Sequence, residues 1–141
     1  MTIQAVNPSI KNSCKFNKSE TLVLNYLIRK PKVKINKPPV LIMLHGVGAN
    51  EKALFPLTNK IDDKFLIISA QAPYKYSENS YGWYKVDFST GKPVIDHSQA
   101  EKSRIILLQF INQIVEKYNS NADKVYLMGF SQGAIMAFLW H

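Results

Sequence analysis

The sequence predicts an α/β fold in which helices cover both faces of a mostly parallel sheet. Three continuous apolar runs, at residues 40–44, 65–69 and 125–129, are typical of strands that are buried on both faces. Residues 99–118 lie between the second and third runs and carry apolar residues at helical spacing. Strands that alternate with helices need crossover connections, and these favour parallel pairing.

The N-terminal part of the chain precedes these runs. Residues 1–20 are polar, and we expect a poorly ordered segment there. Residues 21–29 are rich in Leu, Val, Ile and Tyr, which predicts a strand. Pro31 and the pair Pro38 and Pro39 bracket the loop that leads to the first buried strand.

The connections between the buried strands carry the less regular sequence. The first buried strand is followed by the loop HGVGAN, residues 45–50, and a short helix is predicted at residues 53–59. Residues 70–95 are rich in Tyr, Gly, Pro and Ser, and a loop of that length inside a compact domain is usually functional. Asp96 or Ser98 can cap the start of the long helix.

The net charge of +8 is concentrated at the N-terminal end of the chain. Residues 1–37 hold eight of the 18 basic residues and one of the ten acidic residues. No nucleic-acid-binding motif accompanies these lysines, so we expect a solvated edge rather than a nucleic-acid site. Nucleic-acid binding through these lysines remains the weakest of three functional hypotheses.

Composition also bounds the location and the chemistry. No apolar run approaches the roughly 18 residues of a membrane span, and the N-terminus lacks a secretion signal, so we expect a cytoplasmic protein. The single cysteine, Cys14, excludes an intramolecular disulfide and a multi-cysteine metal site. The sequence does not indicate an oligomeric state.

A Gly-x-Ser-x-Gly pattern is centred on Ser131, directly after the third buried strand. A serine hydroxyl is a weak nucleophile that must be exposed to substrate and placed beside a base. A sharp turn from strand to helix provides the exposure, and glycines at both sides let the two elements approach closely. Gly129 and Gly133 occupy those places, so Ser131 is predicted to be a catalytic nucleophile.

The loop after the first buried strand is the expected second half of the site. The backbone N–H groups of Gln132 and of Val47, which lies between Gly46 and Gly48, are predicted to form an oxyanion hole. Each such donor typically lowers the barrier by about 3 kcal/mol.

Four motifs in order, LHGVGAN (residues 44–50), SAQAP (69–73), YGWY (81–84) and GFSQG (129–133), resemble those of the phospholipase/carboxylesterase family of α/β hydrolases. This group includes acyl-protein thioesterases and bacterial carboxylesterases. The resemblance runs from about residue 21 to the end. It implies a partial α/β-hydrolase domain at residues 21–141, truncated after the helix that follows the serine.

The resemblance also implies a function. It implies a hydrolase of small-molecule carboxylic esters, with thioesters and lysophospholipids as further candidate substrates, that needs neither a cofactor nor a metal. It implies a Ser–Asp–His triad in that chain order. It further suggests that Trp83 and Tyr84 help to line the substrate pocket.

The triad is incomplete in this chain. Only ten residues follow Ser131, and none is acidic. His141 lies on the helix that leaves the serine turn, about 15 Å along it, and cannot reach the hydroxyl. The strand at residues 125–129 is also expected to have one bare edge, because no later strand follows it.

Upstream residues are weak substitutes for the missing acid and base. His45 is expected to shape the loop that follows it, and His97 with its neighbour Asp96 is expected to belong to a helix start. Asp87 and Asp123 are most simply loop and turn residues. We therefore expect the nucleophile-bearing portion of a serine carboxylesterase, weakly active or inactive alone. The alternative is a non-catalytic acyl or ester binder, or a truncated product without function.

Overall fold

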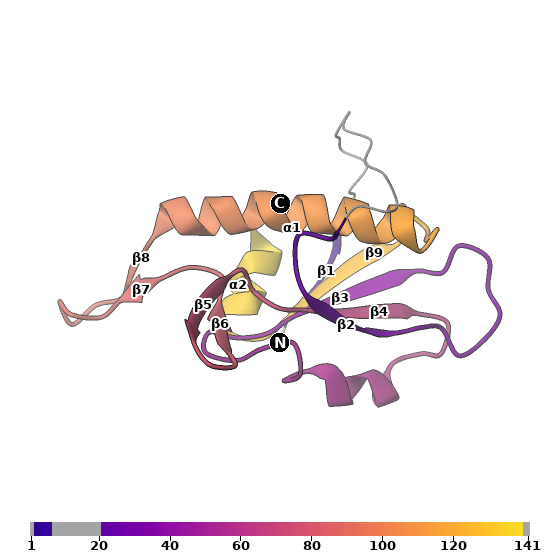
Figure 1. Ribbon diagram of the computed structural model, residues 1–141, viewed down its shortest axis with the longest axis horizontal. Coiled ribbons are helices and arrows are strands. Elements are labelled where there is room, and N and C mark those ends of the chain that lie inside the picture. The colour runs from indigo at the N-terminus through magenta and orange to yellow at the C-terminus, as the bar shows by residue number, and fades with distance from the viewer. Residues whose placement is uncertain (1, 7–20, 140–141) are drawn as a thin grey trace.

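The computed structural model describes residues 2–6 and 21–139, which form one main sheet and its covering helices. The sheet has five strands in the order β1-β9-β3-β4-β2. Their bounds are Thr2–Val6 (β1), Tyr26–Arg29 (β2), Val40–Leu44 (β3), Leu66–Ala70 (β4) and Val125–Gly129 (β9). The three inner strands are parallel, and β1 and β2 are antiparallel edge strands (Figure 1). The predicted mostly parallel sheet is therefore confirmed.

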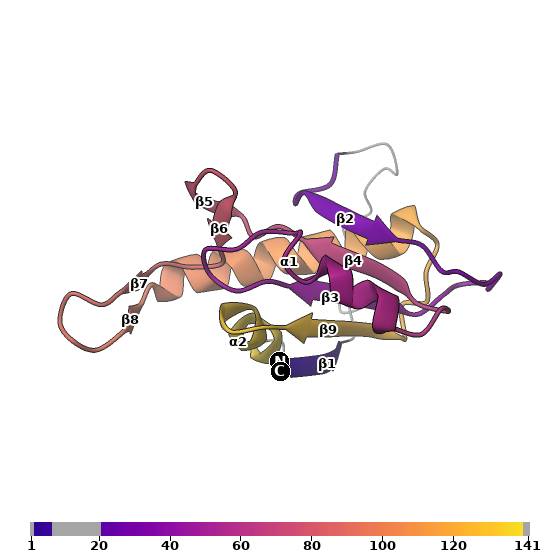
Figure 2. The ribbon, with the colours of Figure 1, turned by 90° about the horizontal axis from the view of Figure 1, so that it is seen from below.

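Both faces of the sheet are apolar, which explains the continuous apolar runs. Side chains alternate between the faces of a strand, so Ile42 and Leu44 enter one core while Leu41 and Met43 enter the other. The helices α1 (His97–Lys117) and α2 (Gln132–Phe138) cover the first face. The 3-10 helix η1 (Phe55–Lys60) lies on the opposite side of the sheet from α1 (Figures 1 and 2).

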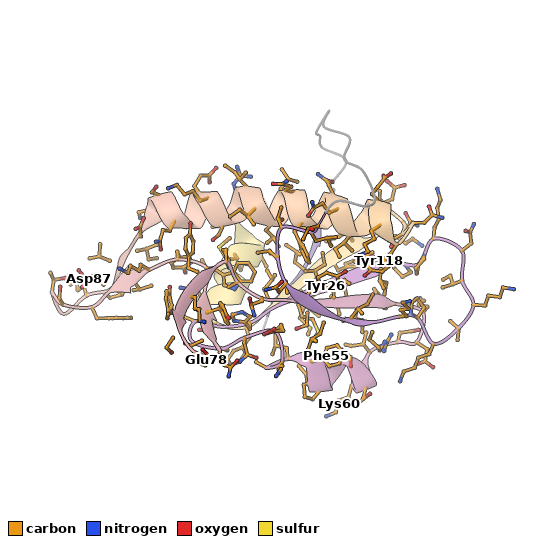
Figure 3. All side chains as sticks on the ribbon, in the orientation of Figure 1. Tyr26, Phe55, Lys60, Glu78, Asp87 and Tyr118 are labelled. Carbon is orange, nitrogen blue, oxygen red and sulfur yellow. The ribbon has the colours of Figure 1, made fainter. Side chains whose placement is uncertain are left out.

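Helix α1 confirms the long predicted helix, with a start two residues earlier than expected. The Asp96 side chain caps it by accepting a hydrogen bond from the Gln99 N–H at 3.0 Å. Tyr26 of β2 packs edge-on against Phe110. Its hydroxyl shares a hydrogen bond of 2.6 Å with the hydroxyl of Tyr118, and both tyrosines are labelled in Figure 3. In the part of the chain that the structure describes, no helix is both long and apolar enough to span a membrane.

The long segment at residues 70–95 is not a plain loop. It contains two short hairpins, β5 (Tyr74–Ser77) with β6 (Ser80–Gly82) and β7 (Val86–Asp87) with β8 (Val94–Ile95). The β7–β8 hairpin projects beyond the start of α1 at the left of Figure 1. These strands carry polar and turn-forming residues whose side chains remain largely exposed. Their sequences therefore lack the apolar pattern from which a strand is predicted.

Two further expectations differ from the structure. The strand predicted at residues 21–29 is shorter, since only Tyr26–Arg29 pairs with β4. The helix predicted at residues 53–59 is the 3-10 helix η1, which has a proline in its first turn.

The N-terminal strand β1 corrects two expectations about the ends of the domain. Residues 1–20 were expected to be poorly ordered, but Thr2–Val6 pair with β9 from Thr2 opposite Gly129 to Val6 opposite Val125. The edge of β9 that we expected to be bare is therefore covered (Figure 2). The other residues of that predicted segment, 1 and 7–20, lie outside the described ranges.

Candidate active site

Strand β9 passes into α2 through a sharp turn whose tip is Ser131. The backbone of Ser131 has φ 57° and ψ −118°, a combination that residues with a side chain rarely adopt. Phe130 anchors the turn by donating its N–H to the Leu44 carbonyl of β3 at 3.1 Å. The Ser131 side chain is exposed at this turn. The local geometry is thus the strand, strained turn and helix that the sequence pattern predicts.

Glycines allow the backbones around Ser131 to approach closely. A Cβ on Gly133 would lie 2.1 Å from the carbonyl oxygen of Leu44, and one on Gly129 would lie 2.3 Å from the backbone of Gly133. A Cβ on Gly46 would lie 3.3 Å from the Cβ of Ser131. The loop after β3 therefore packs directly against the serine turn.

Two backbone N–H groups near Ser131 have no acceptor among the residues that the structure describes. The Val47 N–H belongs to the loop after β3, and the Gln132 N–H begins α2. Neither N–H donates a hydrogen bond to any residue among those that the structure describes. The predicted oxyanion donors are thus available for an acceptor from outside the protein.

An apolar hollow of about 350 Å³ opens at Ser131. Its lining consists of small or apolar residues apart from the serine itself: Gly46, Val47, Ala49, Ala53, Leu54, Phe130 and Ser131. Within the part of the chain that the structure describes, no charged side chain lines the hollow. The arrangement can accept an uncharged group next to the serine hydroxyl.

His45 shapes the loop after β3 rather than facing the serine. Its Nε2 accepts the Ala72 N–H at 3.0 Å, so the ring proton resides on Nδ1, which donates to the Gly46 carbonyl at 2.7 Å. Burial lowers the pKa of His45, although the Gly46 carbonyl and the charge of Glu51 oppose that shift. Both ring nitrogens are occupied, so the neutral ring has no free site for the Ser131 proton.

Protonation of His45 should destabilise the fold. Because the folded pKa lies below the ordinary value of 6.5, the unfolded chain binds this proton more readily, and stability should fall as the pH drops through 6.5. Urea unfolding between pH 7.5 and 5.5 measures this loss. His45→Gln should flatten the dependence, whereas His97→Gln, at an exposed position, should keep it. An unchanged pH dependence in His45→Gln would contradict this role.

The structure places Trp83 and Tyr84 beneath the site rather than on its surface. Their exposed fractions are 0% and 2%, and neither lines the hollow at Ser131. We expected both residues to help line the substrate pocket, but they do not line this hollow. Their polar groups instead hydrogen-bond to the loop after β3 and to Gln132. The sequence analysis assigned no role to the side chain of Gln132, although a glutamine within an otherwise apolar motif indicated that the side chain has one.

The remaining candidate acids and bases stay away from Ser131. Asp96 caps α1, His97 is exposed at the start of that helix, and Asp87 accepts the Ser89 N–H at 2.8 Å. That hydrogen bond lowers the pKa of Asp87. His141 lies outside the described residues. Across residues 2–6 and 21–139, no histidine or carboxylate makes a hydrogen bond to Ser131.

The mixed, mostly parallel sheet with helices on its two faces has the α/β-hydrolase type of fold that its structural neighbours share. Residues 27–139 match the sequence model of the family described as Phospholipase/Carboxylesterase. The chain therefore belongs to the phospholipase/carboxylesterase family, as the four motifs predict.

Known relatives are considerably longer than this chain. Feruloyl esterase B of Thermothelomyces thermophilus is 25% identical over 132 residues, which cover 91% of this chain and 42% of the relative. A carboxylesterase from Mesorhizobium loti superposes with a TM-score of 0.70 at 20% identity, over 85% of this chain and 56% of that chain. The Bacillus cereus carboxylesterase gives a TM-score of 0.68 at 22% identity, over 81% and 51%. The chain thus spans about half the length of these relatives.

Proposed function

We propose that this chain is the nucleophile-bearing part of a serine hydrolase of carboxylic esters. The observation that carries the proposal is the position of Ser131. It lies at a strained turn, open to an apolar hollow and near two N–H groups that have no acceptor within residues 2–6 and 21–139. Family membership supports ester hydrolysis as the reaction class.

The proposed reaction proceeds through an acyl-enzyme. The Ser131 Oγ attacks the ester carbonyl carbon while its proton passes to a base, and the carbonyl oxygen becomes an oxyanion. The N–H groups of Val47 and Gln132 stabilise that oxyanion, which is the usual role of such donors. The alcohol then leaves with a proton, and water releases the acid from Ser131.

The base and its acidic partner belong, in this proposal, to parts of a complete enzyme outside the described residues. A chain that spans about half of its relatives is consistent with that placement. Without a base, Ser131 and the oxyanion donors retain only the residual catalysis of a disrupted triad. The chain alone should therefore react slowly.

The hollow indicates which esters fit. Its apolar lining, which includes Leu54 and Phe130, favours an uncharged apolar group and disfavours a charged one by desolvation. We propose simple carboxylic esters with an apolar acyl or alcohol part as substrates. Thioesters and lysophospholipids remain further candidate substrates under the same mechanism.

The second candidate is a non-catalytic acyl or ester binder. The observation that favours it is the lack of a base at Ser131 among the residues described. A binder would hold an ester with measurable affinity without taking up a covalent group. A truncated product without function would do neither.

Labelling with a fluorophosphonate separates these possibilities. We expect slow formation of one adduct, which mass spectrometry of peptides should locate at Ser131. Ser131→Ala should abolish the adduct, whereas Ser89→Ala, at an exposed serine of the β7–β8 connection, should preserve it. Calorimetry with an uncleaved ester analogue tests binding alone. Binding without an adduct would support the binder, and an adduct on another serine would overturn the proposal.

A further inference from the structure

Residues 81–84, named the strut below, hydrogen-bond to both segments that carry the predicted oxyanion donors. On the side of the loop after β3, the Gly48 N–H donates to the Tyr81 carbonyl at 2.8 Å. The Tyr81 N–H donates in return to the Ala49 carbonyl, also at 2.8 Å. This pair of bonds holds the loop that contains Val47 against the first residue of the strut.

Trp83 connects the strut to the other segment as well. Its indole N–H donates at 2.9 Å to the carbonyl of His45, the first residue of the loop after β3. Its backbone N–H donates to Oε1 of Gln132 at 2.7 Å, and Nε2 of Gln132 donates to the Tyr84 carbonyl at 2.8 Å. Trp83 therefore hydrogen-bonds to both segments that carry the predicted oxyanion donors, the loop after β3 and the start of α2.

The strut is well suited to fix a distance because its bonds are shielded from water. Trp83 is 0% exposed and Gln132 is 4% exposed. The hydroxyl of Ser103 donates to the Trp83 carbonyl and so ties the strut to α1. In such surroundings water cannot replace a lost partner, and an unpaired group costs more than the bond itself gains.

We propose that Trp83 and the Gln132 side chain are positioning residues that set the separation between the N–H groups of Val47 and Gln132. This inference rests on the proposed function, since the separation matters only when both groups bind one oxyanion. Donors stabilise an oxyanion only at hydrogen-bond distance, and a displacement of about 1 Å can cost up to about 100-fold in rate. Neither positioning side chain lines the hollow, so each acts through the backbone.

Two substitutions remove hydrogen bonds of the strut separately, one at the loop after β3 and the other at Gln132. Trp83→Phe deletes the indole N–H on the His45 side but retains an aromatic ring and the backbone N–H. Gln132→Met removes both hydrogen bonds that the side-chain amide makes on the serine side, and it keeps the side-chain length. The matched control is Tyr76→Phe, because the Tyr76 hydroxyl donates to the same Tyr84 carbonyl at 2.8 Å without touching either oxyanion segment.

The readout is the kinetics of fluorophosphonate labelling, resolved into reversible binding and covalent reaction. We expect Trp83→Phe and Gln132→Met to lower kinact by about tenfold or more, with KI changed less than about twofold. Tyr76→Phe should retain the wild-type kinact. The inference is overturned if the two strut variants slow labelling no more than Tyr76→Phe does, once thermal melting shows all three folded.

Amide resonances give a test that is independent of catalysis. In ¹H–¹⁵N spectra, Gln132→Met should shift the Val47 amide, and Trp83→Phe should shift the Gln132 amide, each across the strut from the substitution. Tyr76→Phe should shift neither. If wild-type Ser131 takes no label, the proposed function fails while these shifts still test the strut. Unshifted amides would overturn the inference whatever the labelling shows.

Discussion

Replacing Gly133 with alanine should abolish cooperative folding. The added Cβ would lie 2.1 Å from the Leu44 oxygen and 2.6 Å from its carbonyl carbon, and both are backbone atoms of β3. No side-chain rotation can relieve this overlap, so α2 must move away from the sheet. We expect a loss of at least about 4 kcal/mol, which is a large part of the stability of a domain of this size.

Thermal melting followed by circular dichroism measures this effect. The matched control is Gly91→Asn, because a Cβ at Gly91 meets nothing within 4 Å and asparagine tolerates the positive φ found there. That control should stay within about 1 kcal/mol of the wild type. A Gly133→Ala protein that melts cooperatively within a few degrees of the wild type would contradict the packing described here.

Replacing Ser131 with glycine should remove all labelling and make the protein more stable. The backbone at φ 57° and ψ −118° carries strain that typically costs about 1 to 3 kcal/mol for a residue with a Cβ. Glycine relieves this strain but gains about 0.4 to 1 kcal/mol of freedom in the unfolded chain. The net expectation is a stabilisation of about 1 kcal/mol.

Ser131→Ala is the matched comparison, because it removes the hydroxyl and keeps the Cβ. Both variants should lose the fluorophosphonate adduct, but only Ser131→Gly should raise the urea midpoint. A lower midpoint for Ser131→Gly than for Ser131→Ala would show that the turn stores no strain, because glycine then only gains freedom in the unfolded chain. A higher midpoint for Ser131→Gly would show that a serine at this turn, the proposed nucleophile, costs stability.

The inner strands were predictable because burial on two faces imposes a local rule. Residues 40–44 and 125–129 are continuously apolar, and the structure reproduces both ranges as β3 and β9. The serine turn was predictable for a similar reason. A Cβ at Gly129 would meet the backbone of Gly133, and a Cβ at Gly133 would meet the backbone of Leu44 in β3. Close backbone contacts thus require glycine at fixed spacings from Ser131, and these spacings are visible in the sequence.

The missed features depend on contacts between distant parts of the chain. Strand β1 is short, and its pairing with β9 joins residues from the two ends of the sequence. The same holds for Gln132, whose amide meets the strut 48 and 49 positions earlier. The pattern within one segment carries no information about such partners. For this reason the sequence predicted Trp83 as a pocket residue, whereas in the structure it is buried and connects two segments.

The pairing of β1 with β9 has a consequence for biosynthesis. A ribosome delivers β1 before β9, and the partner of Val6 is Val125, so β1 must wait until residue 125 has emerged. β3 also lacks its neighbour β9 until then. Non-local pairings of this kind slow folding and leave strand edges open during translation. Nascent chains that stall before residue 125 should thus depend on chaperones, and the serine turn cannot form before β9 pairs with β3.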